Sequence, residues 1–131
     1  MDEHNMALTA AGIVGSVTAV IHGVVMQRRM VAPLTARAGA DRPAGATINR
    51  LTWALLHYST LSWFLGGLVL IAAAVCPFSP DARLATGLMV GGHYLYGALG
   101  NAWATRGRHP GWMLLALAVG LIGYGLYGPG V

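Results

Sequence analysis

Residues 51–75, LTWALLHYSTLSWFLGGLVLIAAAV, form an apolar run that decides the class of the fold. The run contains no Lys, Arg, Asp or Glu, and it exceeds the ~20 residues that an α-helix needs to cross the hydrocarbon core of a bilayer. Three further runs lack charged residues and reach or approach that length: 7–26, 84–105 and 111–128. The sequence therefore predicts an all-α membrane protein with four transmembrane helices.

The composition supports lipid as the solvent of the outer faces. Of the 131 residues, 56% are hydrophobic and 9% are charged, whereas a soluble domain has about 25% charged residues. So few polar side chains cannot cover a soluble globule of this size. The length allows one domain, residues 1–131. The net charge of +4 does not indicate nucleic-acid binding, because membrane topology already accounts for the positions of the arginines.

The basic residues, all of them arginine, fix an expected orientation. The connection 27–50 holds Arg28, Arg29, Arg37, Arg42 and Arg50, and the connection 106–110 holds Arg106 and Arg108. The other side has only Arg83. The positive-inside rule makes 27–50 a basic cytoplasmic loop and places both termini on the periplasmic side. We therefore predict an antiparallel up-down four-helix bundle, multi-pass in the inner membrane of a bacterium; abundant Ala and Gly without lysine are typical of high-GC bacterial genomes.

Three histidines lie inside the predicted spans: His22, His57 and His93. An ionisable residue within a membrane span is rare and indicates a functional site. Each histidine shares a helix face, at three-to-four spacing, with small or polar residues such as Gly15 and Thr18 beside His22. Small residues mark contact faces between membrane helices. We therefore expect all three histidines to point into the bundle.

The depths of the histidines predict which of them act together. At about 1.5 Å per residue, His22 and His57 both lie ~6–9 Å below the cytoplasmic boundary, and His93 lies ~18 Å deep. Two level imidazoles on neighbouring helices favour a b-type haem, with His22 and His57 as ligands of its iron. A compact three-histidine metal site is disfavoured, because every ligand nitrogen must lie within about 2.0–2.1 Å of one ion.

The surroundings of such a haem can also be assigned. Arg28, Arg29 and Arg50 lie close enough to the boundary to bind the haem propionates. His93 is left as a supporting or quinone-facing group. Other uses stay open. The histidines form structural hydrogen bonds across helices, worth ~0.6 kcal/mol each, bind a transition metal, line a quinone pocket, or carry protons, since histidine titrates near neutral pH.

The function expected from these features is a supporting one. The connections are too short to build a site for a soluble substrate, so we predict no catalytic activity of its own. We expect an accessory or assembly subunit of a larger respiratory or electron-transfer complex, in contact with lipid and other membrane subunits or with copies of itself. The many glycines of 111–128 exceed the needs of one contact face, which favours a partner helix. The alternative is a small homo-oligomeric transporter or channel that uses the intramembrane histidines.

Overall fold

The computed structural model describes residues 2–37 and 43–128, and this part of the chain is helical apart from short turns and caps. The helices are α1 (Glu3–Met26), the π-helical η1 (Gln27–Val31), α2 (Ala32–Arg37), α3 (Pro43–Val75), α4 (Pro80–Thr105) and α5 (Gly111–Tyr127). The predicted all-α class is confirmed. Each of the four predicted spans falls on one helix: α1, α3, α4 and α5.

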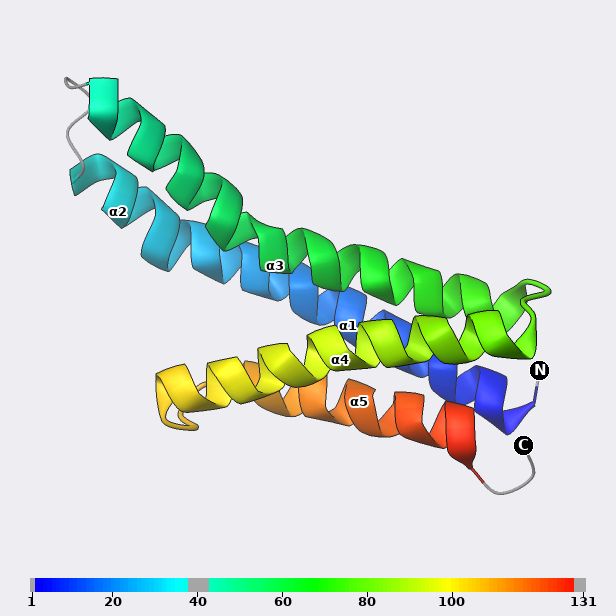
Figure 1. Cartoon of the computed structure of the whole chain (residues 1–131). Coiled ribbons are helices and arrows are strands. Elements are labelled where there is room, and N and C mark those ends of the chain that lie inside the picture. Colours follow the sequence, from blue (N-terminus) through cyan, green and yellow to red (C-terminus); the bar gives the residue numbers. More distant parts are fainter. Residues whose placement is uncertain (1, 38–42, 129–131) are drawn as a thin grey trace.

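The four long helices form a ring in which sequence neighbours are also neighbours in space (Figure 1). α1 packs against α3 and α5, and α4 packs against the same two helices. Successive helices run in opposite directions, so α1 begins and α5 ends at the same end of the bundle. There the ring of His4 stacks on the ring of Tyr124, with centroids 5.4 Å apart. The arrangement is the up-down bundle that short connections favour.

The segment 27–50 differs from the predicted loop. The backbone keeps right-handed helical angles at Gln27 and Ala32, so α1 continues through η1 into α2. The π-helical stretch ends at Val31, two residues before Pro33, which interrupts the hydrogen-bond ladder because proline has no N–H to donate. Arg28 and Arg29 thus mark the end of the apolar run and not the end of helical structure. Arg42, part of the predicted loop, lies outside the described residues.

The first hairpin consists of α1, η1, α2 and α3, and the second consists of α4 and α5. The helical continuation makes the first hairpin longer than the second. α3 has 33 residues, which corresponds to about 50 Å, whereas α4 has 26 residues and α5 has 17. The α2 end of the first hairpin therefore projects beyond α4 and α5 (Figure 1). The exposed side chains of Arg28, Arg29 and Arg50 lie on this projecting part.

Two helical segments are long and apolar enough to cross a membrane: Glu3–Ala36 and Gly45–Val75. They contain the first and second predicted spans. α5 is apolar but has 17 residues. α4 is long but less apolar, because glycines, His93, two tyrosines and Asn101 interrupt its run.

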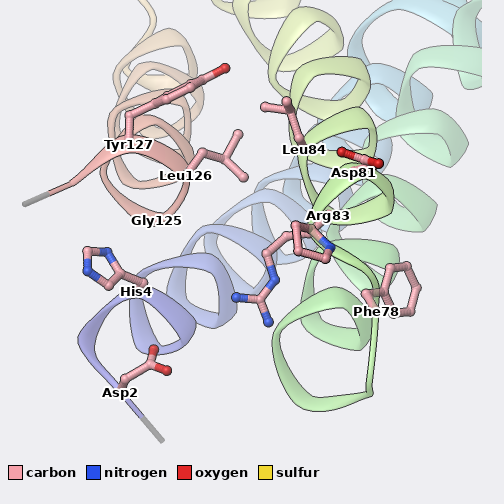
Figure 2. Close-up of a pocket in the computed structure, with 10 residues that line it drawn as sticks. Asp2, His4, Phe78, Asp81, Arg83, Leu84, Gly125, Leu126 and Tyr127 are labelled. Atoms are coloured by element: carbon pink, nitrogen blue, oxygen red, sulfur yellow. The ribbon is translucent and has the colours of Figure 1, made fainter. Parts of the chain in front are cut away.

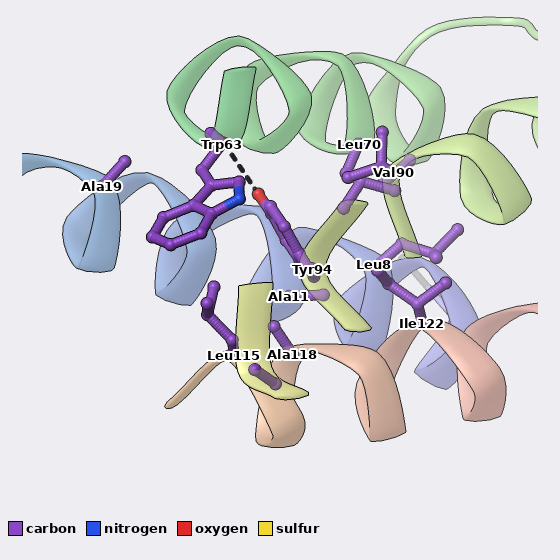
Figure 3. Close-up of a cluster of buried hydrophobic side chains, with 12 residues drawn as sticks. Leu8, Ala11, Ala19, Trp63, Leu70, Val90, Tyr94, Leu115, Ala118 and Ile122 are labelled. Carbon is purple, nitrogen blue, oxygen red and sulfur yellow. Dashed lines mark hydrogen bonds between the residues drawn. The ribbon is translucent and has the colours of Figure 1, made fainter. Parts of the chain in front are cut away.

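All four long helices contribute to the core (Figure 3). Its buried side chains are Leu8, Ala11, Ala19, Trp63, Leu70, Ala74, Val90, Tyr94, Ala98, Leu115, Ala118 and Ile122. α1 and α3 approach most closely where glycines face each other: a Cβ on Gly12 would meet the carbonyl oxygen of Gly67. In the centre, the fully buried Tyr94 donates a hydrogen bond to the Trp63 carbonyl oxygen, 2.9 Å away.

Candidate functional site

A cleft of about 280 Å³ between α1, α3 and α4 contains two of the three span histidines. The two hairpins diverge towards this end of the bundle (Figure 1), and the cleft lies between them. Its lining is His22, Met26, Tyr58, Ser59, Ser62, Trp63, His93, Tyr96, Gly97, Gly100 and Asn101. Tyr58 and Tyr96 are 65% and 82% exposed, so the mouth opens on the side of the bundle. We refer to this site as the His22–His93 cleft.

His22 forms the α1 wall of the cleft. Its side chain is half-buried, and its Nε2 lies 3.4 Å from the Ser59 hydroxyl, a long distance for a hydrogen bond. The imidazole also packs against the Trp63 indole, with ring centroids 4.7 Å apart. Trp63 is itself held in place, because its indole fills the space that a side chain at Gly97 would need. Packing therefore positions His22 more than hydrogen bonding does. Its ring nitrogens remain able to form a hydrogen bond to a ligand.

His93 and Asn101 supply the polar groups of α4. The Nδ1 of His93 lies 2.8 Å from the Met89 carbonyl oxygen, and a carbonyl can only accept, so Nδ1 carries the proton. In the neutral ring, Nε2 is therefore an acceptor. The Nδ2 of Asn101 donates to the Gly97 carbonyl oxygen over 2.9 Å, and its Oδ1 remains as an acceptor.

His57 lies in a different groove, between α1 and α3. Its Nε2 is 2.9 Å from Oε1 of Gln27, and its ring packs near Trp53 with centroids 5.0 Å apart. The groove is about 450 Å³ and is lined by Val20, Trp53, Ala54, His57, Tyr58, Thr60, Leu61 and Phe64. The predicted partners His22 and His57 thus line separate spaces, because depth along a helix does not fix the direction of a side chain around it.

These positions bear on the predicted haem and on the arginines predicted to bind its propionates. Binding one haem iron would require the Nε2 atoms of His22 and His57 to leave Ser59 and Gln27. Arg28, Arg29 and Arg50 are exposed on the projecting part of the first hairpin and line neither space. Across the described residues, no three His, Cys, Asp or Glu side chains group closely enough to hold a metal ion. The haem stays a prediction.

His22 also borders a second cavity, of about 230 Å³. Its lining is Thr18, Ile21, His22, Trp63, Asn101, His109, Pro110, Gly111 and Leu114. His22, Trp63 and Asn101 thus stand between this cavity and the His22–His93 cleft. The exposed His109 belongs to the α4–α5 connection, so polar side chains link the cleft to the end of the bundle. Local sequence does not group Ser59, Asn101 and His109 with His22, because the four residues come from four separate segments.

A fourth space lies at the opposite end, where α1 and α4 begin and α5 ends (Figure 2). Its volume is about 540 Å³, and its lining is Asp2, His4, Phe78, Pro80, Asp81, Arg83, Leu84, Gly125, Leu126 and Tyr127. We refer to it as the Arg83 pocket. This pocket could not be predicted from the sequence, because its residues come from three separate segments.

The candidate sites rest on these residues and their geometry. No protein family model, no curated protein and no solved structure matches the chain.

Proposed function

We propose that the protein is a multi-pass subunit of a larger electron-transfer complex in the bacterial inner membrane, and that it binds a lipid-soluble quinone in the His22–His93 cleft. The observation that carries this proposal is the placement of His22 and His93 on opposite walls of one cleft. The wall between them is largely apolar, with a few polar groups, as is common in small-molecule sites. The lateral mouth faces the medium from which a quinone would arrive.

The surface of the bundle supports insertion in a membrane. Large apolar side chains are exposed on all four long helices, among them Val17, Leu55, Leu61, Leu88, Leu99 and Leu117. Contiguous apolar surface of this kind is rare on soluble monomers, and lipid would solvate it. The described charged side chains lie towards the two ends: Asp2, Glu3, Asp81 and Arg83 at one, and Arg28, Arg29, Arg50, Arg106 and Arg108 at the other.

The polar groups of the cleft match the two oxidation states of a quinone headgroup. Nε2 of neutral His93 accepts a hydrogen bond from a quinol hydroxyl. The imidazole of His22 and the hydroxyl of Ser62 supply donors to the opposite oxygen. The indole of Trp63 offers a flat face to the ring. At about 280 Å³, the cleft is near the lower end of ligand pockets, ~300–1,000 Å³, which favours a single ring over a porphyrin.

Three glycines support a partner subunit on the α4–α5 side. A Cβ added to Gly92, Gly120 or Gly123 would meet no other atom within 4 Å. These positions therefore do not serve the packing of this bundle. Small residues on a membrane-facing surface allow another helix to approach closely. The partner would be another subunit or a second copy of the chain.

A homo-oligomeric transporter or channel is the second candidate, and the two cavities that meet at His22 favour it. In that function, His93, His22 and His109 would carry protons between mid-bundle and the α4–α5 end, since histidine titrates near neutral pH. Proteoliposomes with an imposed pH gradient separate the candidates. A proton flux that His22→Leu abolishes supports transport, and the quinone proposal requires no such flux.

Quinone binding can be tested by tryptophan fluorescence in mild detergent. A variant with W53F, W103F and W112F keeps Trp63 as its only tryptophan. A short-chain benzoquinone should quench Trp63 saturably, and the matched ligand without ring oxygens should bind at least ~10-fold more weakly, because polar groups of the site stay unpaired. The control keeps only Trp103, which is 85% exposed and does not line the cleft. Equal, unsaturable quenching in both variants would mean partition into detergent and would contradict the proposal.

A further inference from the structure

The Arg83 pocket holds a half-buried cation whose charge acts on the carboxylate of Asp2 across the pocket. The guanidinium of Arg83 projects towards the first turn of α1 (Figure 2). Within the described part of the chain it forms no hydrogen bond and no ion pair. A partly desolvated charge is costly unless an opposite charge or hydrogen-bonding group meets it. The planar fork of arginine matches the oxygens of a phosphate group.

Two carboxylates line the same pocket. Asp2 accepts hydrogen bonds from the backbone N–H of Asn5 at 2.8 Å and from its Nδ2 at 3.1 Å. The backbone hydrogen bond holds the pKa of Asp2 below its ordinary value, so this carboxylate remains ionised at neutral pH. Asp81 lies in the first turn of α4 and is exposed. One cation and two anions around one space suit a ligand that carries both charges.

The remaining wall is apolar and continues along the bundle. Phe78, Leu84 and Leu126 line the pocket. Leu84 and Leu88 lie four residues apart on α4 and are 37% and 58% exposed, so they form an apolar stripe that leads away from the charged end. A ligand with a charged head and a hydrocarbon tail would contact both parts.

We propose that the Arg83 pocket binds a phospholipid whose headgroup carries a phosphate and a primary ammonium, as in phosphatidylethanolamine. The phosphate pairs with Arg83, the ammonium faces Asp2, and one acyl chain lies along Leu84 and Leu88. A primary ammonium keeps three N–H donors for the carboxylate, whereas a choline headgroup has none. The site is independent of quinone binding, because it lies at the other end of the bundle.

The test measures thermal unfolding of the detergent-purified chain with added lipids of identical acyl chains. Phosphatidylethanolamine should raise the midpoint by roughly 3–6 °C, and phosphatidylcholine and phosphatidylglycerol by clearly less. R83Q should remove the preference, and the matched control R108Q, at the other end, should keep it. D2N should shift the preference towards phosphatidylglycerol, because the partner of the ammonium loses its charge, while asparagine can still cap α1.

Three results would overturn the proposal. The first is equal stabilisation of the wild type by all three lipids, or by none. The second is an unchanged preference in R83Q. The third is a full shift with soluble O-phosphoethanolamine, which would show that the pocket takes a free headgroup compound and not a lipid. None of these results depends on whether the His22–His93 cleft binds a quinone.

Discussion

The hydroxyl of Tyr94 on α4 donates a hydrogen bond to the backbone carbonyl oxygen of Trp63 on α3, across 2.9 Å of buried core. The side chain of the same Trp63 packs against His22. One interaction thus joins α3 to α4 beside the cleft and fixes the residue that positions His22. The core and the candidate site are therefore coupled at Trp63.

Tyr94→Phe should lower the free energy of unfolding by about 0.6–1.5 kcal/mol, because it removes this hydrogen bond and keeps the ring. Denaturation in mixed micelles, followed by circular dichroism, measures the change. Tyr96→Phe is the matched control, since Tyr96 is 82% exposed, and it should change stability by less than ~0.5 kcal/mol. Equal effects of the two substitutions would show that the Tyr94 hydrogen bond does not stabilise the bundle.

Gly12→Ala should destabilise the bundle by about 1–3 kcal/mol, because its Cβ would meet the Gly67 carbonyl oxygen and force α1 from α3. Gly123→Ala adds the same methyl group where no other atom lies within 4 Å. It should be neutral or stabilise by up to ~1 kcal/mol, through the higher helix propensity of alanine. The same denaturation assay compares them. If Gly12→Ala were as well tolerated as Gly123→Ala, the close α1–α3 contact would be wrong.

The single cysteine provides a test of orientation. Cys76 is exposed and lies between α3 and α4, at the end where α1 begins. With the proposed periplasmic termini, a membrane-impermeant maleimide should label Cys76 in intact spheroplasts. In a Cys76→Ser background, Arg108→Cys should react only after the membrane is permeabilised. The reverse pattern would invert the orientation, and labelling of both sites without permeabilisation would argue against a spanning bundle.

The predicted haem can be tested by a reduced-minus-oxidised visible spectrum of the purified protein. Because His22 and His57 line separate spaces, a haem between them would require both side chains to move, and a spectrum without a sharp α-band would contradict the prediction. A band that disappears in both His22→Ala and His57→Ala would instead establish both histidines as haem ligands, with electron transfer through this chain itself.

The sequence predicted the helices well because their signal is local. Four uncharged apolar runs identify α1, α3, α4 and α5, and short connections order them around the ring. Arg28 and Arg29 mark the end of the apolar run at Met26, where α1 also ends, but the backbone of the predicted loop stays helical to Arg37. Neither residue favours a turn, so nothing local stops the helix there.

The candidate site was predictable only in part. His22, His57 and His93 stand out as ionisable residues inside apolar spans. Counting residues from the span ends predicts the depth of each histidine. The grouping of His22 with His93 depends on which way each side chain points around its helix. That direction follows from contacts such as Gln27 with His57 and Trp63 with Gly97, which join distant parts of the sequence. The pocket around Arg83 could likewise not be predicted, because it forms only where α1, α4 and α5 meet.

The central claim is that the ligand site is the His22–His93 cleft and not a pair of His22 and His57. The most direct measurement is the benzoquinone dissociation constant, from Trp63 fluorescence, in His22→Leu and His57→Leu variants of the single-tryptophan protein, each first shown to unfold cooperatively. We predict at least ~10-fold weaker binding in His22→Leu, through loss of a ligand hydrogen bond, and a change of less than ~2-fold in His57→Leu. Equal losses in the two variants, or no loss in His22→Leu, would contradict the account.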